Sequence, residues 1–182
     1  MAEDAKEATG SMGDDTPLAV LSDRYRPLYH FFRQNFSQVT NPPIDSLREN
    51  KVMSLKTRFG NLGNILDFDT LTKDNIYVLN SPILSNSQFS KFVNFFGRNS
   101  LNVDCTFSKD ENLTIAIQRI QKESEIAVRK GITQLILTDI NLSFERLPMP
   151  MLLCVGAINT YLIEKKLRGY VSINVQSGEA LD

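Results

Sequence analysis

The sequence predicts an α/β protein: an N-terminal helical and irregular segment, then a β-α-β-α-β-α-β alternation with a mainly parallel sheet. Its apolar share of 42% and charged share of 23% are those of a soluble globular domain. From residue 76 onward, short apolar runs alternate with helix-period stretches at intervals of about 30 residues, which indicates parallel strands joined by right-handed crossovers. Because four strands cannot close a barrel, we expect the sheet to be incomplete.

The N-terminal part divides into two predicted stretches. Residues 1–16 are small, acidic and glycine-containing, and we expect a flexible start there, with the folded domain spanning 17–182. Leu28, Phe32 and Phe36 recur at i, i+4 and i+8, which predicts an amphipathic helix from about Pro27. Proline suits the first turn of a helix, and the helix must end before Pro42.

Residues 36–66 read as a rigid, polar and non-repetitive segment. Pro42 and Pro43 fix two φ angles and remove two backbone donors, and Asn41 before them is pushed toward an extended conformation. Gly60 and Gly63 suit turns with positive φ. This is the kind of loop that carries function on a scaffold.

The first half of the alternation contains two predicted strands and one predicted helix. An apolar run at 76–79, stopped by Asn-Ser-Pro, predicts a strand, and the phenylalanines of 86–96 have helical spacing. Alternating apolar residues predict a second strand over 101–107.

The second half is predicted to contain two helices and two strands. The sequence Ser-Lys-Asp-Glu at 108–111 matches a capping box that starts a helix, and Gly131 ends that helix. Glu125 and Arg129 form an i, i+4 pair on its wet side. A mostly apolar strand at 132–138, a helix over about 149–166 and a strand at 170–175 follow.

Charge and cysteine content exclude several classes of function. A net charge of −1 gives no electrostatic reason to expect nucleic acid or an anionic membrane as a partner. No apolar run approaches the roughly 20 residues that span a bilayer. Cys105 and Cys154 are too few for a disulfide framework, a zinc site or an iron–sulfur cluster, so two buried free thiols are expected.

Four further features are candidate functional sites, and a structural role is the favoured interpretation of each. His30 has no nucleophile at a recognisable spacing, so a structural histidine is favoured over a general base. Asp14 and Asp15 are a metal pair or, more simply, capping or solvated charges. The G-x-x-G sequence at 60–63 is an RNA-binding loop or a plain turn. Asp139 follows a buried strand, where α/β sheets bind ligands, but a loop or cap residue is the simpler alternative.

The long N-terminal motif resembles a known family. The stretches GDDTPLAVLS, QVTNPPIDSLRE, VMSL and GNLGNIL, all within residues 11–66, resemble the start of the central domain of the glutamate synthase large subunit. The resemblance continues through VRKGITQLILTD to the final VQSGEALD, and it is weakest over 68–108.

This resemblance implies a role within a larger parent chain. In the family, an amidotransferase domain releases ammonia from glutamine, and an FMN domain with an iron–sulfur cluster makes and reduces 2-iminoglutarate. The central domain connects these two domains and helps to wall the ammonia tunnel. The resemblance therefore implies no catalytic, cofactor-binding or metal-binding residue here, with FMN and the cluster held elsewhere in the parent. It implies the two flanking domains as partners and a cytoplasmic location, or a plastid for some parents. Without those neighbours, we expect exposed apolar faces, such as that of the helix near 149–162, to be able to pair with a second copy.

Four residues of the matched motif are predicted tunnel or interdomain contacts. A sequestered ammonia path must exclude bulk water, and it needs a rigid backbone with small or uncharged side chains. Those predicted contacts are Thr40, Asn41, Met53 and Thr57. Alternatively, the side chains of Thr40 and Asn41 simply hydrogen-bond to backbone groups of the turn.

The rival function is a stand-alone α/β module that binds a small ligand near Asp139 and the 60–63 loop.

Overall fold

The computed structural model describes residues 18–32, 47, 54–60, 66, 76–81 and 83–179. The chain divides into two compact units, Met1–Lys56 and Thr57–Asp182. The described part of the first unit contains two 3-10 helices, η1 (Ala19–Leu21) and η2 (Leu28–Phe31).

The predicted amphipathic α-helix from about Pro27 is wrong over residues 28–32. Pro27 and Phe32 are both extended, and the turn between them closes through i→i+3 bonds from His30 N to Pro27 O and from Phe32 N to Tyr29 O. Aromatic residues and histidine have modest helix propensity, and no side chain caps this turn. Only a short 3-10 turn therefore forms there.

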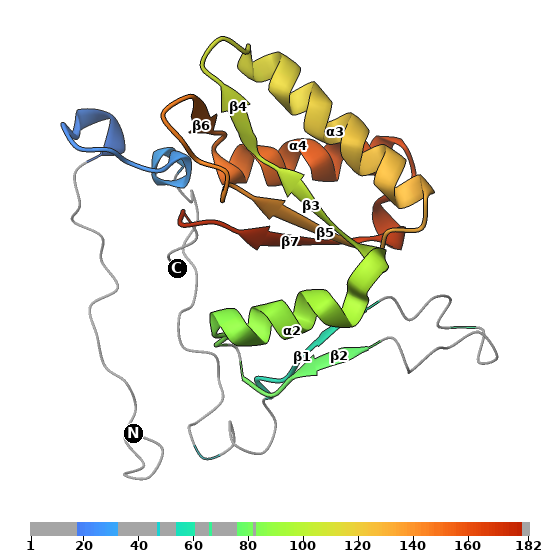
Figure 1. Ribbon diagram of the computed structural model, residues 1–182. Coiled ribbons are helices and arrows are strands. Elements are labelled where there is room, and N and C mark those ends of the chain that lie inside the picture. The colour runs from blue at the N-terminus through green and yellow to red at the C-terminus, as the bar shows by residue number, and fades with distance from the viewer. Residues whose placement is uncertain are drawn as a thin grey trace. The chain divides into compact units, whose positions relative to one another are not determined.

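The second unit is built on a parallel sheet, as predicted. Strands β3 (Ser100–Asp104), β5 (Gln134–Thr138) and β7 (Ser172–Gln176) pair in the order β3-β5-β7. Helices α3 (Leu113–Arg129) and α4 (Met151–Glu164) connect them and lie on the same side of the sheet (Figure 1). The α/β class and three of the predicted strand positions are confirmed.

The core lies between this sheet and the two helices. One face of the sheet contributes side chains from neighbouring strands to this core. The facing side chains of α3 and α4 complete it. Its fully buried members include Val103, Leu135, Leu137, Ile120, Ile158 and Leu162. Every residue of β5 is buried, as expected for the central strand of a parallel sheet.

The strand predicted at 76–79 exists but does not belong to the parallel sheet. It is β2 (Tyr77–Leu79), which pairs antiparallel with β1 (Thr57–Phe59). Val78 is 45% exposed, so the strand is covered on one face only, which suits an antiparallel pair. Rings of Phe59 and Tyr77 contact Phe92 of α2 (Asn86–Phe96), and this aromatic cluster holds β1, β2 and α2 together.

The strand predicted at 101–107 is two strands. β3 ends at Asp104, and β4 (Thr106–Ser108) turns away to pair antiparallel with β6 (Arg146–Pro148). The break falls at Cys105, whose N–H still donates to Thr138 O at 2.8 Å. The apolar alternation of 101–107 continues across the break, so it did not reveal the change of partner.

The start of α3 differs from the prediction, whereas its end agrees. The predicted capping box at 108–111 is wrong: Asn112 is the cap, and its side-chain oxygen accepts from Thr114 N at 2.8 Å. A capping box is present instead at Ser85 and Gln88, before α2. Gly131 ends α3 with φ +90°, as expected.

Candidate functional site

The end rows of the parallel strands define the place where α/β sheets bind ligands. Asp104, Thr138 and Gln176 are aligned across β3, β5 and β7, and we call this row and the residues that follow it the carboxyl edge. The residues that precede β5 and β7 form the opposite amino edge. The carboxyl edge carries a polar network that links several elements, and the amino edge carries a cleft.

Asp104 is the centre of the largest polar network at the carboxyl edge. Its Oδ1 accepts from Thr106 N at 2.9 Å and from Thr106 Oγ1 at 2.7 Å, and its Oδ2 accepts from Arg146 Nη2 at 3.0 Å. Arg146 Nε also donates to Thr106 Oγ1 at 2.8 Å. Arg119 of α3 donates to the carbonyl oxygens of Asp104 and Thr106 at 3.1 and 2.7 Å.

The network shifts the pKa values of its carboxyl groups in opposite directions. Partial burial acts to raise the pKa of Asp104, but hydrogen bonds from the Thr106 hydroxyl and amide and from the Asn141 side chain, together with Arg146, lower it overall. Burial raises the pKa of Glu123, which Arg119 offsets only in part. Asp104 is therefore an anchored anion at neutral pH, and each of its oxygens is already occupied.

Asp139, the residue singled out by its position after β5, is also bonded within the fold. Its Oδ2 accepts from Ser177 Oγ at 2.6 Å, which ties the loop after β5 to the segment after β7. Thr138 Oγ1 accepts from Ile140 N at 3.3 Å in the same turn. These contacts are those of a loop residue with a structural role, the favoured interpretation of Asp139.

The carboxyl edge also caps a helix. Glu179 Oε2 accepts from Met151 N at 2.8 Å, which places a carboxylate at the N-terminus of α4.

Across the described residues, no group of three or more His, Cys, Asp or Glu side chains is placed to hold a metal ion. The arrangement of bonds fixes loops to one another, and the Thr106 and Ser177 hydroxyls at this edge donate to Asp104 and Asp139 within those cross-links.

Cys105 and Cys154 are both buried and unoxidised, as expected. They come from distant parts of the sequence, yet their side chains meet in the core, where a hydrogen bond with Cys154 and burial raise the pKa of the Cys105 thiol. A thiol of that kind is not a nucleophile at neutral pH. Their proximity follows from the β3–β5–α4 packing and has no local sequence signal.

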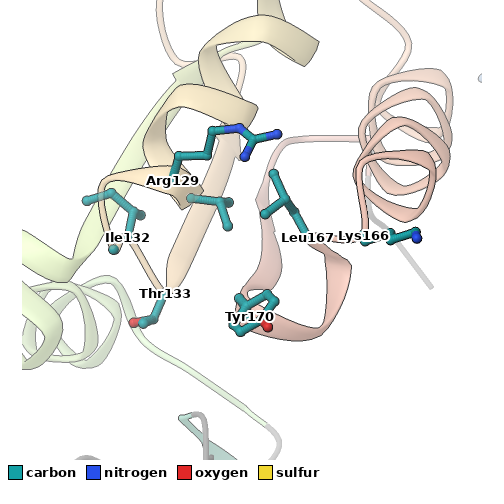
Figure 2. A pocket seen from close by; sticks show the side chains of 8 residues that line it. Arg129, Ile132, Thr133, Lys166, Leu167 and Tyr170 are labelled. Atoms are coloured by element: carbon teal, nitrogen blue, oxygen red, sulfur yellow. The ribbon is translucent and has the colours of Figure 1, made fainter.

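A cleft of about 570 Å³ lies at the amino edge. It is lined by Val128, Arg129, Gly131, Ile132, Thr133, Lys166, Leu167 and Tyr170. Figure 2 shows these side chains contributed by the ends of α3 and α4 and by the segments that lead into β5 and β7, with the ammonium of Lys166 pointing away from the others. Arg129 is engaged by Glu125 at 2.8 Å. The rival function placed its ligand near Asp139, at the other edge.

The structure describes only part of the sequence-predicted site. Thr40, Asn41 and Met53 lie outside the described residues, as do Asp14, Asp15 and positions 61–63. Thr57 is the first residue of β1, exposed and opposite Leu79 in the register. Gly60 follows that strand with φ +138°, a conformation that favours glycine. His30 packs its ring edge-on against Tyr29, with centroids 4.7 Å apart.

No helix formed by the described residues is both long and apolar enough to cross a bilayer.

The network around Asp104 and the contact between the two free cysteines are features that the sequence did not predict. For Asp104 no local signal existed, because the apolar alternation of 101–107 continues past it. For Arg119 and Arg146 no signal existed, because each is separated from its partner by a helix or a loop.

Comparison with known proteins identifies the family. The glutamate synthase central domain family matches residues 1–182. The chain is 54% identical to the glutamate synthase (NADPH) large chain of Azospirillum brasilense, covering all of this chain and 12% of that protein. It is 42% identical to the corresponding large chain of Bacillus subtilis, and 38% identical to the chloroplastic ferredoxin-dependent glutamate synthase of Spinacia oleracea. Those two alignments each cover 98% of this chain, and 12% and 11% of the relatives. The chain therefore spans about a tenth of the length of the relatives it matches, and it belongs to the glutamate synthase central domain family.

Proposed function

We propose that this chain is the connecting part of a glutamate synthase polypeptide, situated between its glutamine amidotransferase and FMN domains. The observation that carries the proposal is the family match over all 182 residues, while the relatives are many times longer. The parent reaction converts glutamine, 2-oxoglutarate and a reductant into two glutamates. FMN and the iron–sulfur cluster would be bound by other parts of that parent, in the cytoplasm or in a plastid.

The described chemistry supports a scaffold rather than a reacting centre. The charged groups at the carboxyl edge join β3 to α3 and β6, and they join the loop after β5 to the segment after β7. Such cross-links give a stiff frame, which an ammonia path requires if solvent is to be kept out. Thr40, Asn41, Met53 and Thr57 are the proposed contacts with that path or with the flanking domains.

The choice of electron donor does not depend on this region. Relatives named for NADPH, NADH and ferredoxin all match over at least 98% of the chain in the Azospirillum, fission yeast and spinach proteins. A segment that selected the donor would be expected to match one class only. The donor is therefore set elsewhere in the parent or by a partner protein.

A chimaera tests the proposal. The matching stretch of the Azospirillum large chain is replaced by this 182-residue sequence, and glutamine-dependent glutamate synthesis is measured together with free ammonia. We expect synthesis to be retained, and we expect the 182-residue chain alone to show neither glutaminase nor synthase activity. Turnover by the isolated chain, or an inactive but folded chimaera, would contradict the proposal.

Variants of the chimaera test the proposed tunnel contact. Thr57→Arg adds a long charged side chain at a proposed path contact, and we expect more free ammonia per glutamate formed. Thr114→Arg is the matched control, because Thr114 is an exposed threonine at the start of α3 and lies outside the matched motif. An unchanged ammonia-to-glutamate ratio in Thr57→Arg would remove Thr57 from the proposed site.

A further inference from the structure

Helix α4 is covered on one face and one flank. Met151, Cys154, Ile158 and Leu162 point into the core. On the flank that meets α3, Ala157 O accepts from Gln121 Nε2 at 3.1 Å, and Tyr161 OH donates to Glu125 Oε2 at 2.6 Å. These contacts fix the rotation of α4 about its axis.

The opposite flank of α4 carries exposed apolar side chains. Leu152, Gly156 and Ile163 are separated by four and seven residues, so they form one stripe along the helix. Asn159 lies between Gly156 and Ile163 in this stripe, and its Oδ1 accepts from Arg168 Nε at 2.8 Å. At 3.6 residues per turn, the stripe lies about 140° around the axis from the core row, on the side away from α3. Leu152 is 46% exposed and Ile163 is 57% exposed. We call Leu152, Gly156 and Ile163 the outer stripe.

Gly156 has no explanation within the chain. Glycine in the middle of a helix is less favourable than alanine by about 1 kcal/mol. A methyl group added at Gly156 would meet nothing within 4 Å, so packing inside this protein does not require a glycine there. A second backbone that approaches α4 closely at this point would require it.

The topology of the sheet indicates what approaches. β3, β5 and β7 are added in one direction, and the crossover helices α3 and α4 lie side by side on one face of the sheet (Figure 1). Among the described strands, β7 pairs on one side only, with β5. A further right-handed β-α unit added in the same direction would place its strand along β7 and its helix against the outer stripe.

We propose that the outer stripe is the docking surface for an apolar helix from the rest of a glutamate synthase polypeptide. The proposal rests on the proposed function, since the matched region makes up only 12% and 9% of the relatives' lengths. Leu152 and Ile163 are apolar, and the one polar side chain between them, Asn159, is neutral and bonded to Arg168, so the partner presents a mainly apolar face. Gly156 lets the two helix axes approach to about 8 Å, the near limit of helix packing.

The test compares two contexts by amide hydrogen exchange of residues 152–163. In the chimaera described above, we expect this segment to exchange at least about tenfold more slowly than in the isolated 182-residue chain. Leu152→Glu combined with Ile163→Glu should abolish the difference, because charge on the stripe excludes an apolar partner. Gln118→Glu, at an exposed position of α3, is the control and should leave both rates unchanged.

Gly156→Ala gives an independent readout of opposite sign. In the isolated chain it should raise Tm by about 2–4 °C, the shift expected for 1 kcal/mol in a protein of this size. In the chimaera it should speed exchange of 152–163, because the methyl group holds the partner away. Equal exchange in both contexts would overturn the proposal, even in an active chimaera. A dimer of the isolated chain that Leu152→Glu dissociates would also overturn it, by assigning the stripe to a second copy. Because exchange is read separately from activity, loss of the parent function and loss of docking are distinguishable.

Discussion

The two edges of the parallel sheet differ: polar side chains link several elements at the carboxyl edge, and a cleft lies at the amino edge. At the carboxyl edge, Arg146 donates to the Asp104 carboxylate, Arg119 donates to the backbone carbonyl oxygen of Asp104, and Ser177 donates to Asp139. At the amino edge, a cleft remains between the ends of α3 and α4, and Lys166 adopts a φ of +58°. The edge that binds ligands in other α/β sheets is cross-linked here. In this chain, the edge where other α/β sheets bind ligands stiffens the fold instead, which suits the proposed connecting role.

The largest expected effect comes from removing Arg146. Its guanidinium makes three hydrogen bonds, to Asp104 Oδ2, Thr106 Oγ1 and Thr106 O. We expect Arg146→Met to lower the free energy of unfolding by about 2 kcal/mol, since it leaves a partly buried carboxylate without its cation. Chemical denaturation measures this. Arg146→Lys keeps the positive charge but loses the planar set of guanidinium N–H donors. It should recover less than half of the lost free energy of unfolding.

Arg98→Met is the control for a cationic side chain, because Arg98 is exposed in the turn between α2 and β3. It should change stability by less than about 0.5 kcal/mol. If Arg146→Met behaved like Arg98→Met, the carboxyl edge would not be cross-linked in solution, and the contrast between the two edges would fail.

A smaller effect is the pH dependence contributed by Asp104. Its pKa is lowered in the folded state, so its contribution to stability is complete above the ordinary carboxyl pKa near 4 and is lost as pH falls through the folded value. We expect Asp104→Asn to be less stable than the wild type at pH 7, with the gap closing as pH falls below the ordinary carboxyl pKa and through the lowered folded value. The gap at pH 7 should be about 1 kcal/mol, discounted because the Asp104 side chain is 30% exposed and Arg146 is 37% exposed.

Glu123 provides the matched comparison of opposite sign. Burial raises its pKa, so ionisation of Glu123 favours the unfolded chain as pH rises through the two pKa values. Glu123→Gln should therefore match or exceed the wild type in stability at pH 7, and lose that advantage in acid. Unfolding by denaturant across pH 2–7 tests both variants. Parallel pH profiles for Asp104→Asn and Glu123→Gln would contradict the assignment of the shifts.

The difference between the edges also explains what could be predicted from sequence. The buried strand β5, helices α3 and α4, and the glycine that ends α3 follow from local periodicity and turn chemistry, and these were predicted. The partner of β2 and the split at Cys105 depend on contacts between distant segments. The Phe59–Phe92 and Asp104–Arg146 contacts have no local pattern. Such contacts decide which sheet a strand joins, so single-sequence periodicity cannot fix them.

The same distinction holds for the site. Family resemblance indicated Thr40, Asn41, Met53 and Thr57, whereas generic chemistry indicated Asp139. Only Thr57 and Asp139 fall on described residues, and neither lines the cleft at the amino edge. Motif resemblance locates a role in a parent protein without requiring a local constellation of reactive groups. That is why composition and spacing alone ended at an α/β domain without a reaction.

The smallest effect, and the one that probes the amino edge, concerns Lys166. At the end of α4, Lys166 N donates to Ile163 O at 2.9 Å and Leu167 N to Leu162 O at 2.8 Å, so the left-handed residue closes the helix in the position that glycine usually holds. A residue with a Cβ is strained there, and glycine is not. Lys166→Gly should therefore raise the free energy of unfolding by about 0.5–1 kcal/mol. Lys165→Gly is the control, because Lys165 has φ −80°, and there glycine should destabilise through backbone entropy alone. Paired thermal and denaturant unfolding of the two variants measures the signs. If both substitutions destabilise equally, the amino edge carries no strain at Lys166, and it differs from the carboxyl edge only in having a cleft.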